Sequence, residues 1–161
     1  MCDMPHFYGH GSDGLVLEAW WGDIGKEELL RHERSHLLAA KPSRAPRVVV
    51  DLTLARFDSS VGEREIRELT NLYVQYQATV GGARVAIVLG SELDKVYLYE
   101  KYATERGLSV VVFNSIEVAC VWLGANAAQV REWVREAPLK VVDQVAKVDV
   151  EDGDSPHGID L

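Results

Sequence analysis

Short apolar runs alternate along the chain with longer segments in which apolar residues recur at helical spacing. Three of these runs lie at residues 47–52, 84–89 and 109–113, and each opens with one polar residue followed by a series rich in valine. Continuous apolar runs of this length predict strands that are buried on both faces, as in a parallel sheet. The intervening patterns predict helices at about 61–78, between Ser91 and Gly107, and at 115–123.

The N-terminal region predicts a β-hairpin. Phe7 and Tyr8 form a short strand, residues 9–14 form a glycine-rich turn, and residues 15–21 form the second strand. The turn formally matches Gly-x-Gly-x-x-Gly, but it leads into a strand rather than a helix, so we interpret it as a turn and not as a dinucleotide site. In the second strand Glu18 shares a face with Val16 and Trp20, which favours a position near an edge of the sheet. A helix at 26–40, ended by Lys41-Pro42, follows.

Strands that alternate with helices predict an α/β fold with a mostly parallel sheet of four to five strands, an N-terminal hairpin strand and helices packed on the sheet. We divide the chain into an N-terminal arm and hairpin at 1–14, an α/β domain at 15–124, an extra helix at 125–137 that stops before Pro138, and a tail at 138–161. The tail is acidic and lacks a sustained period from Asp143 on, so we expect much of it to be disordered.

Composition narrows the class of partner. The formal net charge is −8 and the isoelectric point is near 5.1, without a Lys/Arg cluster, which argues against binding of nucleic acid or an anionic membrane surface. Only two cysteines occur, Cys2 and Cys120, so neither a disulfide framework nor a cysteine-based zinc site is expected. The chain shows neither a secretory signal pattern nor an apolar run long enough to span a bilayer. We therefore expect a cytoplasmic protein with no cofactor.

The link between the 47–52 strand and the next helix reads Phe57-Asp58-Ser59-Ser60-Val61-Gly62. It resembles the Asp-Ser-Ser-Gly motif of STAS domains, the fold shared by bacterial anti-sigma-factor antagonists and the cytoplasmic tails of sulfate transporters, with Val61 at the position of the family's glycine. Near the end of the domain, Gly107-Leu108, Val111-Val112-Phe113, Ser115, Glu117, Ala119 and Leu123-Gly124 resemble the family's closing strand and helix. The resemblance covers about residues 7–124.

The resemblance implies a non-enzymatic protein–protein interaction module in bacterial regulation, with an anti-sigma or kinase-like protein as partner; it leaves a homodimer open. In the antagonists the first serine of the motif is phosphorylated, which corresponds to Ser59 here, and Ser60 is a second candidate. The implied contact surface comprises Asp58, Ser59, Ser60, Val61, Gly62 and Arg64. A phosphate on a serine at a helix N-terminus is stabilised by free amide groups and the helix dipole.

A structural interpretation of the same serines stands beside the regulatory one. Ser60 and Glu63 have the Ser-x-x-Glu spacing of a capping box, so the hydroxyls would serve to begin the helix, a contribution of about 1 kcal/mol. Asp58, Glu63 and Glu65 would also repel an added phosphate.

Two further alternatives come from other residue patterns. His32-Glu33-Arg34-Ser35-His36 matches the His-Glu-x-x-His pattern of zinc hydrolases on a predicted helix, with Glu63, Glu65 or Glu68 as candidate third ligands; a solvated helix face is the competing interpretation. The second alternative is a small-molecule or lipid pocket, as in SEC14-like folds related to STAS, lined by tyrosines of the predicted helices: Tyr73, Tyr76, Tyr97, Tyr99 and Tyr102. Such residues at helical spacing also suit a core.

Trp122 is expected to pack against the sheet and Trp133 to anchor the extra helix.

Overall fold

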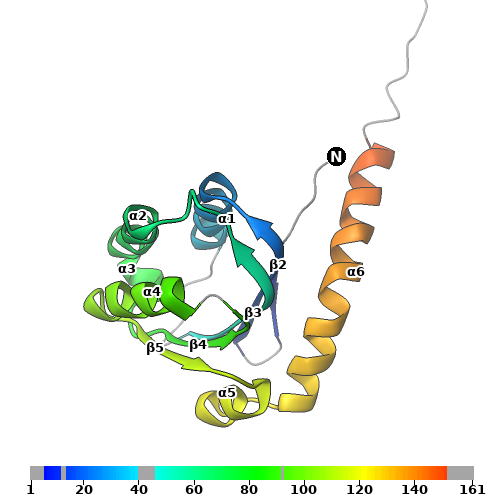
Figure 1. The fold of residues 1–161 in the computed structure, drawn as a ribbon. Helices are drawn as coiled ribbons and strands as arrows, with labels where there is room; N and C mark the ends of the chain where they lie inside the picture. Colours follow the sequence, from blue (N-terminus) through cyan, green and yellow to red (C-terminus); the bar gives the residue numbers. More distant parts are fainter. Residues whose placement is uncertain (1–5, 12–13, 40–45, 92, 152–161) are drawn as a thin grey trace, which may run out of the picture.

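A five-stranded sheet with the spatial order β1-β2-β3-β4-β5 forms the centre of the molecule (Figure 1). The computed structural model describes residues 6–11, 14–39, 46–91 and 93–151. The strands are β1 (His6–His10), β2 (Leu15–Ile24), β3 (Arg47–Phe57), β4 (Arg84–Leu89) and β5 (Ser109–Phe113). β1 pairs antiparallel with β2, and all other pairs are parallel. The predicted α/β class, the N-terminal hairpin and the mostly parallel sheet are confirmed.

Helices cover both faces of the sheet. They are α1 (Lys26–Ala39), α2 (Glu63–Gln75), α3 (Gln77–Val80), α4 (Leu93–Glu105), α5 (Ile116–Leu123) and α6 (Ala127–Glu151). Each parallel strand lies beside the next one in the sequence, so right-handed crossovers place α1, α2 and α4 on the same face. α5 and α6 lie on the opposite side (Figure 1).

Two hydrophobic clusters correspond to these two faces. The first joins α1, α2 and α4 to the sheet and includes Trp20, Ile24, Leu52, Ile66 and Tyr102. The second joins α5 and α6 to the other face and includes Leu17, Val49, Val88, Leu123 and Val130. The strands carry apolar residues on both faces because both faces are covered, which explains their continuous apolar sequence.

β3 is longer than its apolar run. We expected a polar link after Leu52, but the strand continues through Thr53, Leu54 and Arg56 to Phe57. β4 pairs with β3 only as far as Leu52, and the extension pairs with β2 alone, up to the Ile24–Phe57 pair. The extension therefore has one neighbouring strand instead of two and exposes Thr53, Leu54 and Arg56, so its sequence does not continue the apolar run.

The last helix also differs from the prediction. We expected it to stop before Pro138, whereas α6 includes Pro138 and runs to Glu151. Proline removes one backbone hydrogen bond from the helix. Val130 and Ala137, both on the N-terminal side of Pro138, are buried in the second cluster and anchor that part of α6 to the sheet. The disorder expected for the tail stays a prediction, and residues 152–161 lie outside the described part of the chain. No helix in that part is long and apolar enough to cross a membrane.

The tryptophan predictions are confirmed. Trp122 on α5 packs in the second cluster, 5.8 Å from the ring of Phe113 on β5. Trp133 of α6 lies edge-on to Phe7 of β1, with ring centroids 6.5 Å apart. Gly9 allows this approach, since a Cβ atom there would lie 2.9 Å from the Trp133 ring.

Two arginines at the start of neighbouring strands hold the C-terminus of α5. Arg47 donates to the carbonyl groups of Leu123 and Gly124, at 3.0 and 3.2 Å. Arg84 donates to the carbonyl of Trp122 and stacks over its ring. Gly124 ends the helix in the left-handed conformation, with φ at 68°. Positive charge at a helix C-terminus is stabilising, so these contacts fasten α5 to the sheet.

Candidate functional site

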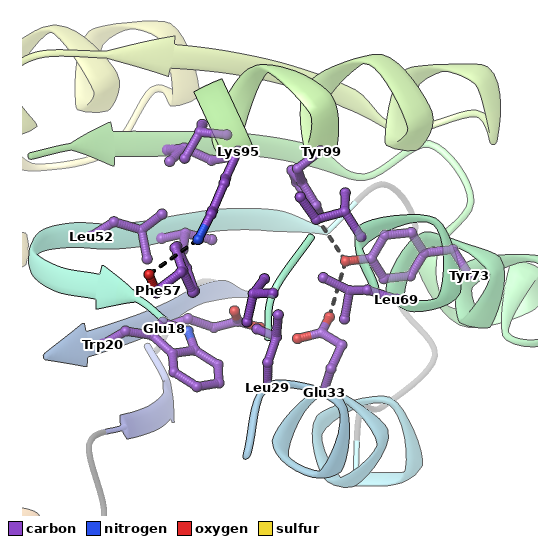
Figure 2. A pocket seen from close by; sticks show the side chains of 15 residues that line it. Glu18, Trp20, Leu29, Glu33, Leu52, Phe57, Leu69, Tyr73, Lys95 and Tyr99 are labelled. Carbon is purple, nitrogen blue, oxygen red and sulfur yellow. Dashed lines mark hydrogen bonds between the residues drawn. The ribbon is translucent and has the colours of Figure 1, made fainter. Parts of the chain in front are cut away.

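Buried polar side chains collect between the sheet and the layer formed by α1, α2 and α4. Glu18 projects from β2, Glu33 and His36 from α1, Tyr73 from α2 and Tyr99 from α4 (Figure 2 shows four of the five). Glu33 is 8% exposed and His36 is 7% exposed. Burying a charged group costs free energy unless the group is paired, and charged residues are rarely found in a protein core. This cluster is therefore the first candidate for a functional site.

The two residues of α1 reach the same point because they lie three positions apart on one helix face. Glu18 contacts them from the sheet, because its side chain lies on the face of β2 that α1 covers. His36 Nδ1 lies 3.2 Å from Glu18 Oε1 and 3.8 Å from Glu33 Oε2. His36 also stacks on Tyr8 and on His6, with ring centroids 4.1 and 4.3 Å apart, so its ring orientation is fixed.

The proton distribution follows from these contacts. Burial lowers the pKa of His36, but its hydrogen bonds to Glu18 and Glu33 outweigh burial and raise this pKa to about 9. Burial and the Glu18 carboxylate raise the pKa of Glu33. His36 is therefore an imidazolium at neutral pH, paired with Glu18.

A chain of hydroxyl groups fixes Glu33 from the other side. The Tyr73 hydroxyl donates to Glu33 Oε1 at 3.1 Å, and the Tyr99 hydroxyl lies 2.7 Å from that of Tyr73 (Figure 2). Because Tyr73 gives its proton to Glu33, Tyr99 is the donor of the second bond. Burial raises the pKa of both tyrosines, so both hydroxyls stay protonated.

Two cavities meet at this cluster. One of about 70 Å³ extends toward the carboxyl ends of the strands, among Trp20, Leu52, Phe57 and Leu69 (Figure 2). One of about 300 Å³ extends the other way, among Tyr8, Val48, Val85 and Leu108. Five residues line both cavities: Glu18, Glu33, Val50, Tyr73 and Tyr99. The space is thus apolar on its walls and polar where the two parts meet.

The His-Glu-x-x-His stretch falls on a helix as predicted, but its side chains separate. Glu33 and His36 join the buried cluster, whereas His32 stacks on His6, with ring centroids 4.8 Å apart. In the described part of the chain, the group able to hold a metal ion is Glu18, Glu33 and His36, whose ligand atoms lie within 4.8 Å of one another. Glu68, one suggested third ligand, instead makes an exposed contact with Arg34.

The serine corner lies at the carboxyl end of β3, where Phe57 and Val61 line the smaller cavity. Asp58 and Ser59 are exposed, and so is Arg64 on the first turn of α2. Val61 is 2% exposed and belongs to the core, so its side chain is not available to a partner. Lys95 of α4 donates to the backbone carbonyls of Phe57 and Asp58, which ties the corner to α4.

Ser60 does not cap α2. The residue before that helix is Gly62, whose amide donates to Glu65 at 3.0 Å. Ser60 Oγ instead accepts a hydrogen bond from the Lys26 amide at the start of α1 and donates to Asp58. The Ser60 hydroxyl and the Ser60 backbone amide both donate to Asp58 and lower its pKa. The serine is therefore a cap for a different helix from the one that the spacing suggested.

Sequence reasoning named Glu33 and His36 in one alternative and Tyr73 and Tyr99 in another, but it missed Glu18 and the cluster that joins these residues. The available signal was Glu18, the one charged residue in the otherwise apolar run 15–21. Comparison of the sequence with protein-family models and with curated proteins finds no match. The function must therefore be argued from these sites.

Proposed function

We propose that this protein is a small-molecule-binding module whose ligand occupies the cavity between the sheet and the α1, α2 and α4 layer. The observation that carries the proposal is the 300 Å³ cavity with an apolar wall and a polar end made of Glu18, Glu33 and Tyr73. This volume lies at the lower end of the range for ligand pockets, and an apolar wall with a few convergent polar groups is their usual form.

The chemistry of the polar end selects the ligand. Its carboxylates and hydroxyls accept hydrogen bonds, and the positive charge of His36 is already paired with Glu18. A ligand with a compact apolar body and an amine or alcohol head is therefore favoured, whereas a carboxylate head meets like charge.

The test compares three probes of equal chain length: octylamine, 1-octanol and octanoate. Binding is followed by amide chemical shifts of the cavity-lining residues Val50 and Val85. We expect octylamine and octanol to shift these signals and octanoate to have little effect. Val50→Phe fills the space and should abolish the shifts, whereas Val118→Phe, on the exposed face of α5, should preserve them. Absence of any shift with all three probes would refute a ligand of this kind.

The serine corner supports a second candidate, the phosphorylation-switched protein interaction module suggested by the resemblance to STAS domains. The supporting observation is the exposure of Ser59 and Arg64 next to the N-terminus of α2. A phosphate there would project toward a partner, although Asp58 and Glu63 oppose the added charge. Peptide mapping of native material tests this candidate: we expect phosphate on Ser59 and not on the engaged Ser60, and its absence from both under all growth conditions would exclude the switch.

A further inference from the structure

The arrangement of Glu18, Glu33 and His36 has the composition of a metal site. The three residues offer two carboxylate oxygens and one imidazole nitrogen, and these atoms lie within 4.8 Å of one another. We infer that they bind one divalent transition-metal ion, of which Zn²⁺ is the simplest case. The inference goes beyond the proposed small-molecule binding and does not depend on it.

The distances suit a common metal centre. Ligand atoms bound tetrahedrally to one zinc ion at about 2.0–2.2 Å lie roughly 3.3–3.6 Å from each other. His36 Nδ1 lies 3.2 Å from Glu18 Oε1 and 3.8 Å from Glu33 Oε2, on either side of this value. Small side-chain movements would therefore bring all three atoms into bonding range.

Charge also favours a cation here. Two carboxylates and one histidine are concentrated in a buried space, and a proton on His36 now offsets one of the negative charges. A divalent ion would balance both carboxylates without a proton. Mixed nitrogen and oxygen ligands of this kind suit zinc and related transition metals better than magnesium or calcium, which prefer oxygen ligands alone.

Surrounding residues hold the three ligands in place, as is typical of metal sites. Tyr73 donates to Glu33 Oε1, which leaves Oε2 directed to His36. Tyr8 and His6 stack on the His36 ring. His6 is 4% exposed, and its Nε2 has no hydrogen-bond partner within the described residues, so an unsatisfied buried nitrogen lies beside the cluster.

The position of the cluster leaves room for a further ligand. All three residues line the 300 Å³ cavity, so the metal would face open space on one side. Three protein ligands with one accessible position are typical of zinc sites that bind water or a small molecule. A purely structural ion pair would not need this access.

The test uses the full chain without a histidine tag, after removal of metal with a chelator. Zn²⁺ titration by calorimetry should show one site per chain, and Co²⁺ should give the visible absorption of a low-symmetry site. Glu18→Gln and Glu33→Gln preserve side-chain shape and should each weaken Zn²⁺ binding by at least about tenfold. His32→Asn is the matched control, because it alters the His-Glu-x-x-His stretch outside the cluster, and should change affinity by less than about twofold.

Other outcomes decide against the inference. Absence of stoichiometric Zn²⁺ and Co²⁺ binding to the wild type would overturn it. Binding that survives Glu18→Gln but is lost in His32→Asn would also overturn it and assign the metal to the His-Glu-x-x-His pattern. Co²⁺ broadening of wild-type amide signals needs no variant: broadening centred on residues 18 and 33–36 supports the site, and broadening centred elsewhere contradicts it. The octylamine and octanol experiment is done without metal, so each proposal can fail alone.

Discussion

The Ser60 hydroxyl accepts a hydrogen bond from the Lys26 amide at 3.0 Å, across 34 positions of sequence. This bond joins the segment after β3 to the beginning of α1. It also distinguishes two adjacent serines by their surroundings. Ser60 is engaged in holding a helix terminus, whereas Ser59 is exposed.

Ser60→Ala should therefore lower the free energy of unfolding by about 1 kcal/mol, because it removes the cap of α1. Ser59→Ala should change it by less than about 0.5 kcal/mol, as is usual for an exposed position. Urea denaturation of both variants measures the difference. Equal effects would show that the Ser60–Lys26 bond does not stabilise the protein.

The buried chain of hydroxyls leads to a second prediction. Tyr73→Phe leaves Glu33 without its donor and Tyr99 without its acceptor, so we expect a loss of about 1–3 kcal/mol in the free energy of unfolding. Tyr97→Phe is the control, because Tyr97 is 52% exposed and the variant's loss of unfolding free energy should be close to zero. If Tyr73→Phe is as stable as the control, the hydroxyl chain contributes no net stability.

His36 should make stability depend on pH in the metal-free protein. Its pKa is about 9 in the folded chain, against an ordinary value of 6.5, so the stabilisation is fully present below pH 6.5 and is lost as the pH rises through 9. We expect the free energy of unfolding to fall by up to about 3 kcal/mol over this interval.

Chemical denaturation of the wild type and of His36→Gln at several pH values measures this effect. The free energy of unfolding of the variant should not fall over this interval. The groups that face His36 are Glu18, Glu33, Tyr8, His6 and His32. Burial and the other histidines lower the pKa of His6 to about 2. The uncharged His6 therefore lowers the stability only below pH 6.5, outside the interval in which His36 loses its proton. Parallel profiles for both proteins between pH 6.5 and 9 would contradict the assignment.

The attachment of α5 to the sheet gives a fourth prediction. Arg47→Met removes two hydrogen bonds to the end of α5 and should cost about 1–2 kcal/mol. Arg56→Met is a suitable control, because Arg56 makes an exposed contact with Asp23 that should contribute less than about 1 kcal/mol. Thermal unfolding distinguishes the two, and a loss in Arg47→Met no larger than that of the control would show that α5 is held mainly by its apolar contacts.

The parallel sheet could be predicted from the sequence because helices cover both faces of β3, β4 and β5. Strands buried on both faces have continuous apolar runs, which the sequence shows directly. It failed where an element depends on distant partners. The extension of β3 mixes polar and apolar residues because only β2 pairs with it. In α6 the described residues that reach the second core all precede Pro138, yet the helix continues to Glu151.

The candidate site was only half visible for a similar reason. Glu33 and His36 appear in the sequence as part of a motif, and their spacing correctly places them on one helix. The third member, Glu18, is separated from His36 by 18 positions, and only the order of β2 and α1 in space brings it into contact. The motif also suggested His32 as their companion, but the turn of the helix directs that ring toward His6 instead.

In the parallel part of the sheet, spatial neighbours are also sequence neighbours, from β2 to β5. Open α/β sheets usually bind ligands in a crevice at the strand ends where the strand order reverses, and the loops around that crevice determine specificity. Among the described strands no such reversal exists. New ligand preferences on this fold would therefore arise from substitutions of inward-facing residues of β2, β3 and α1, rather than from longer or shorter loops.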